Sequence, residues 1–466
     1  MPHYNKKQQK VRYQTVLDLA RAVVTEKDLI TDKYGHTYQY NGQFWEPIKD
    51  RRLSEWCTRY QYRVFDSSYG YTTMEMVNLV RDLARERLGK MLKLRGEVEI
   101  PWGNISEAEV PFSNGVYNCI TRNFRLHRRE DFLETVWAVD YNPNTKCPKW
   151  NRYLKDCFGS QPDYKQIVAV VEKFLGYTLI QQAPYKKALF CYGESNTGKT
   201  VLEKVMAGLV GKENVCHIPI DKMNNPRIVA PIHGKAVNLM SELKFDTIMA
   251  DSGFKQLVST GESIQIDPKY KDPFPYVPFC KHVVFTNEKP NIQDHGQAVF
   301  NRLIVIEFPN VIPTEKQDPG LSQKLETELE GIALKALKGL RRLTYNKGRF
   351  TMPPSVEKAL ASYQQETNPM YEFLKECFLS KPQGMTLMAD VREAFWQYFP
   401  RAKYWSPKKI TQLLKAAGCE IAETSHKGEK GKYLLGYQLK KRYQHPNSRP
   451  ELDDTSEGGE AETSDF

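Results

Sequence analysis

Eight consecutive residues match the pattern G-x-x-x-x-G-K-[ST] in full: Gly193-Glu194-Ser195-Asn196-Thr197-Gly198-Lys199-Thr200. Glycines let backbone amides face an anion without interference from a Cβ atom, and the start of a following helix adds positive potential there. In such a loop Lys199 is expected to reach the β- and γ-phosphates of ATP, and the Thr200 hydroxyl is expected to hold Mg²⁺. The motif predicts an ATP site, and the alternative is a glycine-rich turn with a solvated lysine.

The residues around this loop have the pattern that a phosphate site needs. Ala188–Tyr192 is a short apolar run suited to a buried strand, and apolar residues recur at helical spacing after Thr200 until Gly211. Strand, glycine loop and helix is the arrangement that places backbone amides against phosphates, so the context favours function over a chance match.

A second apolar run ends in an acid. Ala236–Met240 leads into Ser241 and Glu242, which places a carboxylate at the carboxyl end of a predicted strand. Glu242 is our candidate general base for the attacking water and, with Thr200, a candidate on the metal side. Ser241 stands where a first acid would complete an acidic pair. A surface glutamate is the alternative, and Asp246 is a weaker candidate for the same role.

Two further polar residues border predicted strands. Asn287 follows the strand Lys281–Thr286 and could orient the water or contact the γ-phosphate. Arg302 precedes the strand Leu303–Ile306 and could act as an arginine finger on a neighbouring subunit. The alternatives are an ordinary turn residue for Asn287 and a surface ion pair for Arg302.

Residues 263–279 are predicted to form a hairpin with a basic tip. Alternating residues on both sides flank a turn that contains Lys269, Tyr270 and Lys271. Lysine can contact phosphates and tyrosine can stack on a base, so the tip is a candidate DNA contact. A solvated turn is the alternative.

Charge is distributed unevenly along the chain. The net charge is +11, but residues 446–466 carry −6, which leaves +17 for residues 1–445. A body this basic suits a polyanion, with nucleic acid as the leading candidate, although a soluble basic protein would have the same composition.

Compartment and membrane signals point to a cytoplasmic protein. The nine cysteines are scattered singly without a C-x-x-C pair, which favours a reducing environment over disulfides or a zinc ribbon. The sequence has neither a secretory signal nor a run of about 18 apolar residues, so we expect no membrane partner.

With 466 residues, the chain is long enough for two or three domains. Strand-like and helical runs alternate over residues 150–310, which predicts an α/β fold with a mostly parallel sheet. A helix start at Ser406-Pro407 and a basic hairpin near residue 428 suggest a winged helix, with Lys408, Lys409, Lys427 and Lys430 as DNA contacts. The expected order is a disordered start (1–10), a small α+β domain (11–148), the core (149–350), a linker (351–368), the winged helix (369–442) and a disordered acidic tail (443–466).

In this order the elements resemble the superfamily 3 helicases, and most closely the primase-helicases of phages, plasmids and poxviruses. The resemblance covers residues 11–310 and rests on the stretches GESNTGKT, GKAVNLMSEL, FKQLVSTGESIQIDPKYKDPFPYVPF, HVVFTNEKPNI and AVFNRLIVIEF. It implies an AAA+ motor, usually a hexameric ring with ATP between subunits, that moves 3′ to 5′ on single-stranded DNA. It supports the roles given above to Lys199, Thr200, Glu242, Asn287 and Arg302, and it raises the hairpin tip to a DNA contact inside the ring.

The sequence departs from that family in two ways. Ser241 replaces one acid of the metal-side pair, and only about ten residues precede the family-like region, so a primase is expected on a separate chain. The leading hypothesis is a replicative helicase of a virus, phage or mobile element that acts on single-stranded and forked DNA, with a primase or single-strand-binding protein as further partner. The alternatives are an origin-binding initiator and a loader that uses ATP only to assemble.

Overall fold

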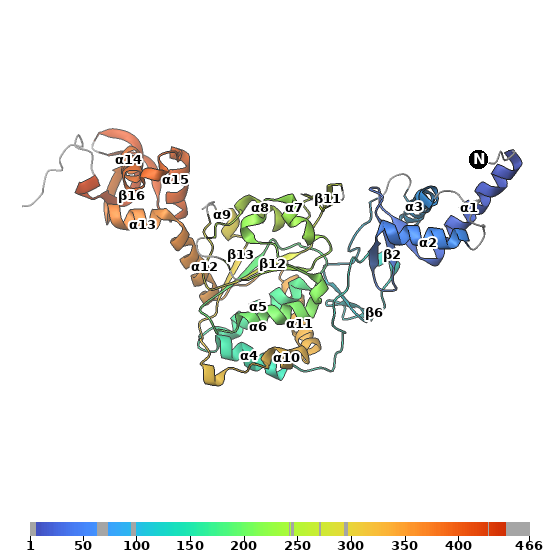
Figure 1. The fold of residues 1–466 in the computed structure, drawn as a ribbon. Helices are drawn as coiled ribbons and strands as arrows, with labels where there is room; N and C mark the ends of the chain where they lie inside the picture. The colour runs from blue at the N-terminus through green and yellow to red at the C-terminus, as the bar shows by residue number, and fades with distance from the viewer. Residues whose placement is uncertain are drawn as a thin grey trace, which may run out of the picture. The chain divides into compact units, whose positions relative to one another are not determined.

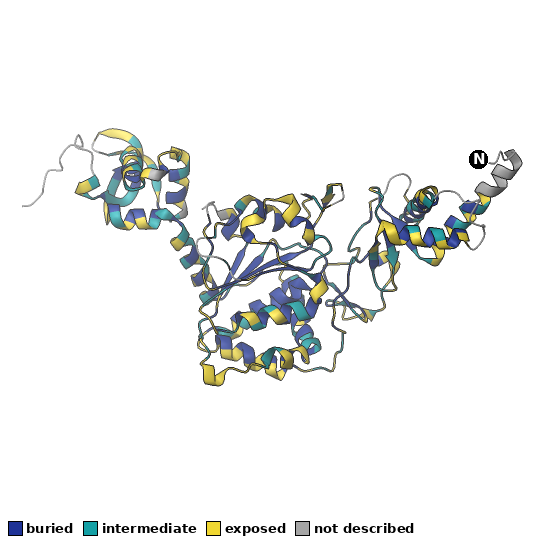
Figure 2. Cartoon of the chain, viewed as in Figure 1, coloured by how far each residue is buried: buried dark blue, intermediate teal, exposed yellow. Residues whose placement is uncertain are grey.

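The computed structural model of the chain describes residues 6–62, 73–94, 99–241, 243, 247–269, 272–292, 297–426 and 428–443. The chain divides into two compact units, residues 1–293 with 298–361 and residues 294–297 with 362–466. Figure 1 shows the elements along the chain, and Figure 2 shows that the strands of the largest sheet are buried.

The amino-terminal part of the first unit combines three helices with a small antiparallel sheet. The helices are α1 (Lys6–Glu26), α2 (Asp50–Tyr62) and α3 (Thr73–Leu92), and the strands are β1 (Leu29–Thr31), β2 (Thr37–Tyr40) and β3 (Trp45–Ile48). A hairpin between β2 and β3 turns at Asn41-Gly42, where the Asn41 carboxamide accepts the amides of Gln43 and Phe44 at 2.9 Å. The prediction of disorder up to residue 10 is wrong from Lys6 onward, since this lysine- and glutamine-rich stretch continues the helix.

A second small sheet lies against the core of the first unit. Its strands are β4 (Glu109–Phe112), β5 (Gly115–Asn118) and β6 (Phe124–Arg125). Trp137 follows this sheet, and its indole donates to the carbonyl of Leu179 at 2.6 Å within one continuous hydrophobic core. The predicted boundary at residue 148 therefore does not separate two compact units, because residues on both sides of it share that core.

The central sheet has five parallel strands in the order β13-β7-β12-β9-β8. Helices cover both faces, and Figure 1 shows α7 and α8 on one face and α4, α5, α6, α10 and α11 on the other. The predicted α/β fold with a parallel sheet is confirmed. The strands are β7 (Ala188–Tyr192), β8 (Val215–Cys216), β9 (Val237–Ser241), β12 (Lys281–Thr286) and β13 (Leu303–Glu307), and the helices are α4 (Pro148–Phe158), α5 (Tyr164–Thr178), α6 (Lys199–Val210), α7 (Pro226–Val229), α8 (Asp251–Leu257), α9 (Gln297–Phe300), α10 (Leu321–Glu326) and α11 (Leu329–Tyr345).

The strand order determines which loops meet. Strand β12 lies between β7 and β9, and all six of its residues are buried, as expected for a strand covered on both faces. Because parallel strands end at the same edge, the segments that follow Tyr192, Ser241 and Thr286 emerge next to one another.

The segment predicted as a linker, residues 351–368, is largely helical. Helix α12 spans Pro354–Thr367, and the Asp163 carboxylate accepts the Ser355 amide at 2.9 Å and its hydroxyl at 2.6 Å. This contact satisfies a free amide in the first turn of the helix. The sequence did not suggest it, because Asp163 lies far away in the chain.

The second unit contains α13 (Pro369–Cys377), β14 (Phe378–Leu387), α14 (Met388–Tyr398), α15 (Pro407–Ala416), β15 (Ile421–His426) and β16 (Glu429–Leu439). Its sheet has the order β14-β16-β15. The predicted helix start at Ser406-Pro407 and the predicted hairpin are present as α15 and as β15 with β16, and the Ser406 hydroxyl accepts the Lys409 amide at 3.2 Å as the expected cap. Strand β14 was missed because Pro382 and Gly384 are typical of a turn, and the pairing is irregular between Ser380 and Met385.

Candidate nucleotide-binding site

The two glycines that frame the predicted phosphate loop are both required by their surroundings. Gly198 has φ +98°, and a Cβ atom there would lie 2.7 Å from the Cys157 sulfur and 3.1 Å from the Tyr153 ring. A Cβ atom at Gly193 would lie 2.5 Å from the carbonyl oxygen of Phe308. The loop is therefore pressed against its neighbours, so only glycine fits at these two places.

Lys199 is buried within the loop and points back into it. Its ammonium donates to the carbonyl oxygens of Gly193 at 2.8 Å and Glu194 at 2.7 Å, and it lies 3.2 Å from the Thr197 hydroxyl. Desolvation lowers its pKa. Among the described residues Lys199 forms no ion pair, so an anion held in this hollow would meet a preformed cation. The loop therefore fits the phosphates of a nucleotide.

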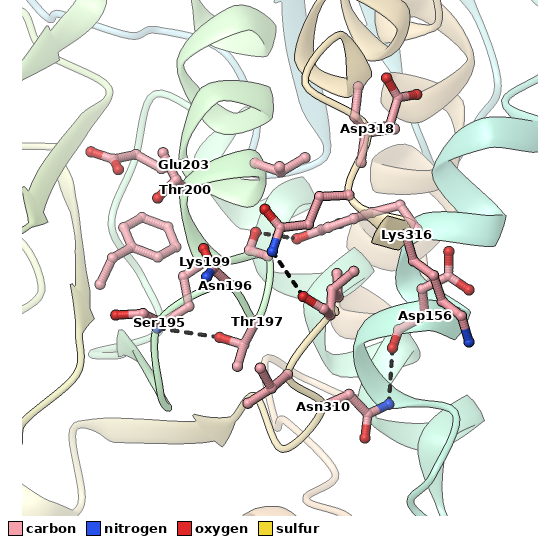
Figure 3. Close-up of a pocket in the computed structure, with 18 of the residues that line it drawn as sticks. Asp156, Ser195, Asn196, Thr197, Lys199, Thr200, Glu203, Asn310, Lys316 and Asp318 are labelled. Carbon is pink, nitrogen blue, oxygen red and sulfur yellow. Dashed lines mark hydrogen bonds between the residues drawn. The ribbon is translucent and has the colours of Figure 1, made fainter. Parts of the chain in front are cut away.

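A cleft of about 1330 Å³ opens over the loop. Its walls come from the loop, from the ends of β9 and β12, from α4 and from residues 310–318. Figure 3 shows Ser195–Thr200 on one side of it, with Asn310 and Lys316 nearby. The Ile312 amide donates to the Asn196 carbonyl at 2.9 Å, so the segment after β13 is tied directly to the loop.

Several predicted site residues meet at this cleft. The Asn287 carboxamide donates to the Ser195 hydroxyl at 3.3 Å, which joins the end of β12 to the phosphate loop. Thr200 is exposed in the first turn of α6 and lines the cleft, as does Ser241 at the end of β9. Glu242 and the weaker candidate Asp246 lie outside the described residues.

Arg302 does not join this group. The Ala188 amide donates to the Arg302 carbonyl at 2.8 Å, so Arg302 lies where β7 begins, whereas the phosphate loop follows the end of β7. Five residues of extended strand separate these positions by roughly 16 Å. The Arg302 guanidinium donates from Nη1 to the Ala298 carbonyl at 2.7 Å, while its Nε is buried and has no partner among the described residues.

The predicted basic hairpin is present as β10 (Ile264–Ile266) and β11 (Phe274–Tyr276), which pair antiparallel. Lys269 is exposed near its tip, while Tyr270 and Lys271 lie outside the described residues. The Tyr276 hydroxyl accepts the Gly234 amide at 3.0 Å and lies 3.4 Å from Glu134, whose pKa burial raises to about 8. The base of the hairpin is therefore held by two separate segments of the first unit.

The predicted DNA contacts of the second unit lie at two places. Lys408 is exposed in the first turn of α15, and the Lys409 ammonium lies 3.9 Å from the centre of the Trp405 ring. Lys430 is exposed at the start of β16, and Lys427 lies outside the described residues. The structure thus leaves Lys408 and Lys430 accessible, whereas Lys409 packs on an aromatic ring.

Sequence reasoning missed the helix beneath the loop. The Tyr153 hydroxyl donates to the Gly198 carbonyl at 3.0 Å, and Tyr153 is almost fully buried in α4. This contact fixes the backbone immediately before Lys199. Nothing in the sequence linked that helix to the loop, because Tyr153 and Gly198 are far apart in the chain.

Among the described residues, none of the helices combines the length and the apolar character of a membrane span. Within the same part of the chain, no three or more His, Cys, Asp or Glu side chains are grouped so that they could hold a metal ion.

Two parts of the chain match known families. Residues 28–159 match the family described as D5 N terminal like, and residues 191–302 match a family of unknown function, DUF5906. The second match contains the whole phosphate loop, together with β9, β12 and the hairpin.

Curated relatives include viral proteins named as helicases. The chain is 25% identical over 221 residues to "Putative helicase V13" of Sputnik virophage, covering 44% of this chain and 27% of that protein. It is 23% identical over 387 residues to "Putative helicase 121R" of Invertebrate iridescent virus 3, covering 72% of this chain and 39% of that protein. The chain thus spans between about a quarter and two fifths of these relatives.

A similar fold occurs in the solved apo structure of the NrS-1 C terminal region. The TM-score is 0.51 at 13% identity, and the match covers 90% of this chain and 99% of that one. Together, the D5-like match and the viral relatives named as helicases support the resemblance to D5-like viral primase-helicases.

Proposed function

We propose that this chain is an ATP-dependent DNA helicase that serves the replication of a virus, a phage or another mobile element. One observation carries the proposal: a buried Lys199, which forms no ion pair among the described residues, lies in a glycine loop that is joined through Ser195 to Asn287 at the end of the neighbouring strand. Viral relatives named as helicases support the choice of helicase among ATP-using proteins.

In the proposed mechanism ATP would supply the phosphoanhydride bond whose hydrolysis drives the motor, and Mg²⁺ would neutralise charge on its phosphates. Lys199 would bind the β- and γ-phosphates, and the Thr200 hydroxyl would help to hold the metal ion. Glu242 would take a proton from the attacking water as general base and would lie on the metal side with Thr200. Asn287 orients that water or the γ-phosphate, and its hydrogen bond to Ser195 keeps it beside the loop.

A ring explains the place of Arg302. Because this residue lies at the opposite end of β7 from the phosphate loop, it serves the ATP site of a neighbouring subunit in the proposal. A closed ring, hexameric as in the family that the sequence resembles, brings such pairs together repeatedly. The hairpin tip, Lys269 with Tyr270 and Lys271, then contacts single-stranded DNA inside the ring during 3′ to 5′ movement.

A specific observation favours a second candidate function. The second unit orders its elements as helix, strand, two helices and a two-stranded hairpin, which is the arrangement we expect of a winged helix. If Lys408 and Lys430 read duplex DNA there, the protein is an origin-binding initiator, and sequence-specific footprints on duplex DNA would separate this candidate from the first. A loader that uses ATP only to assemble on DNA would hydrolyse ATP without displacing strands.

A helicase of this kind acts on forked DNA with a separate primase or single-strand-binding protein. It would work at the viral replication site or in the cytoplasm of a bacterial host.

Strand displacement tests the proposal. We expect the protein to displace a labelled strand from a 3′-tailed DNA fork in the presence of ATP and Mg²⁺, and Lys199→Ala to abolish it. Lys204→Ala is the matched control, because Lys204 is an exposed lysine on the same helix and lies outside the cleft. DNA-stimulated ATP hydrolysis without displacement would favour the loader or the initiator, and displacement by Lys199→Ala would exclude the proposed ATP site.

A further inference from the structure

The carboxyl half of α11 and the turn after it form a strongly basic surface. Residues 335–349 contain six Lys or Arg residues and no Asp or Glu. Lys338, Arg342, Lys347 and Arg349 are exposed, and Arg341 is half-buried. We refer to Lys338, Arg341, Arg342, Tyr345, Lys347 and Arg349 as the α11 surface.

Several exposed cations on the amino-terminal helices are compensated by an acid of the same helix. Examples on α1, α2 and α3 are Arg21–Asp18, Arg51–Glu55 and Lys90–Glu86. The printed sequence offers no such acid after Glu330 on α11. Arg342 reaches the nearly buried Glu172 at 3.4 Å, and Lys335 reaches the same carboxylate at 3.8 Å.

The other four cations of the α11 surface lie farther from acids, although the charge of Lys338 also acts to lower the pKa of Glu172. Among the described residues, Lys338, Arg341, Lys347 and Arg349 form no ion pair. Cations in the last turn of a helix are stabilised by the helix dipole, but Lys338 precedes that turn and Lys347 and Arg349 follow it. The helix dipole therefore does not compensate the positive charge of these residues. An anion bound from outside the chain would compensate it.

An exposed aromatic ring lies among these charges. Tyr345 is 64% exposed, and the Arg341 guanidinium lies 5.5 Å from the centre of its ring. Aromatic rings beside cations suit single-stranded nucleic acid, because an unpaired base can stack on the ring while the cations contact phosphates.

The turn that carries Lys347 and Arg349 is preorganised. The Gly348 amide donates to the Leu343 carbonyl at 2.9 Å, and the Arg349 amide donates to the Asn346 carbonyl at 3.0 Å. Gly348 has φ +75°, and a Cβ atom there would lie 2.4 Å from the Tyr185 ring. A fixed turn reduces the entropy lost when its cations bind a ligand.

We propose that the α11 surface binds single-stranded nucleic acid, with Lys338, Lys347 and Arg349 on phosphates and Tyr345 under a base. The inference rests on the proposed function in taking nucleic acid as the partner. It adds a nucleic-acid contact that differs from the two already proposed, the hairpin tip and the lysines of the second unit. Tyr185 lies just before β7, so the surface is at the end of the sheet opposite the phosphate loop.

The test measures binding of a fluorescent oligothymidylate to the full chain by anisotropy, without nucleotide, at several salt concentrations. One variant combines Lys338→Gln, Lys347→Gln and Arg349→Gln, and a second is Tyr345→Ala. The matched control combines Arg21→Gln, Arg51→Gln and Lys90→Gln, which removes the same charge from residues that have acidic partners.

We expect the triple variant to reduce the slope of log K against log salt by about 2, because each phosphate contact on a single strand contributes about 0.7. Tyr345→Ala should weaken binding roughly tenfold with little change in slope, since stacking is not electrostatic. The control variant should keep the wild-type slope.

Three results would overturn the inference. The first is a slope in the triple variant equal to that in the control, and the second is an unchanged affinity in Tyr345→Ala. The third is a triple variant that loses binding to duplex DNA while its binding to the oligothymidylate stays intact. ATP hydrolysis and strand displacement are measured on the same preparations. Oligonucleotide binding through the α11 surface without any hydrolysis would reject the motor and retain the surface. If the protein hydrolyses ATP and displaces strands but the slope is unchanged in the triple variant, the motor is retained and the α11 surface is rejected as a binding site.

Discussion

The two ends of the central sheet carry different kinds of chemistry. At the carboxyl ends of the strands, Lys199, Thr200 and Asn287 gather around one cleft although they come from separate segments. At the amino ends, Arg302 precedes β13, and Lys281 is buried at the start of β12. The residues at the carboxyl ends come together within a single chain, whereas Arg302 lies at the other end of the sheet and does not line that cleft.

In the proposed mechanism a single subunit carries only part of this chemistry. Binding of phosphates would require only the carboxyl end, because the loop, its lysine and its glycines are already in place. Stabilising the charge that develops during hydrolysis would require a further cation, which Arg302 is proposed to supply to another copy. We therefore expect nucleotide binding and hydrolysis to respond differently to changes at the two ends.

The largest effect is expected from combining changes at both ends. Arg302→Ala and Lys199→Ala should each lower ATP hydrolysis by about 10³-fold or more, because an arginine finger alone is worth that much. Mixed together, the two variants should regain activity, since roughly a quarter of randomly mixed interfaces would hold one intact Lys199 and one intact Arg302. The measurement is phosphate release by each variant and by the mixture.

The mixing experiment has a clear control and a clear contrary result. A preparation of the double variant Lys199→Ala/Arg302→Ala, mixed with either single variant, should stay inactive, because no interface then contains both residues. If the two single variants fail to rescue each other while both still assemble with wild type, Arg302 does not act on a neighbour.

A smaller effect is expected at Asn287. Asn287→Ala should reduce the rate of hydrolysis about 10²-fold with little change in nucleotide affinity, because it removes a polar group that acts on the water or the γ-phosphate. Ser195→Ala removes only the hydrogen-bond partner of Asn287 and should cost less than tenfold. Measuring kcat and KM for both variants separates the two roles. Equal losses in both would make the hydrogen bond, and not Asn287 itself, the important feature.

Much of the carboxyl end could be predicted from the sequence. The phosphate loop, the strands β7, β9, β12 and β13 and the hairpin were all visible as apolar runs or turn signals that are local in the chain. Local patterns determine elements, whereas the order of strands in a sheet depends on contacts between distant segments. The sequence alone therefore did not show that Asn287 lies beside Ser195, or that Arg302 lies at the far end of β7.

The contacts beneath the loop were not predictable for the same reason. Tyr153 and Cys157 approach Gly198 across about 40 residues, and neither side chain has a motif of its own. The sequence did not predict strand β14 for another reason, because Pro382 and Gly384 are more typical of turns than of strands. In both cases tertiary packing overrode what the local residues favoured.

Gly198→Ala should weaken nucleotide binding at the carboxyl end by roughly tenfold or more. The added methyl group would meet the Cys157 sulfur at 2.7 Å, and alanine is strained at φ +98°. Gly261→Ala is the matched control, since Gly261 has φ +64° but nothing within 4 Å of the new Cβ atom, so it adds strain without a clash. Nucleotide affinity by calorimetry is the measurement. Equal effects in the two variants would show that strain alone is responsible.

The smallest effect on activity is expected from a substitution of Lys281. This residue lies at the amino end of β12, and its substitution should change the free energy of unfolding. This lysine is fully buried, donates to the Ile180 carbonyl and lies 5.0 Å from the centre of the Tyr177 ring. Burial lowers its pKa to about 7, well below its value in an unfolded chain. Between about pH 7 and 10 the unfolded state therefore binds more protons than the folded state, and this residue makes stability rise with pH.

Lys281→Met should remove that rise and increase the free energy of unfolding at pH 7 by about 1 to 2 kcal/mol, less any cost of leaving the Ile180 carbonyl unpaired. Urea unfolding at pH 7, 8 and 9 measures the slope, with the exposed Lys186→Met as control. Nucleotide affinity should stay unchanged, because Lys281 is at the opposite end of β12 from Asn287. If nucleotide affinity falls while stability rises, the two ends of the sheet are coupled and the contrast between them is not as sharp as the geometry indicates.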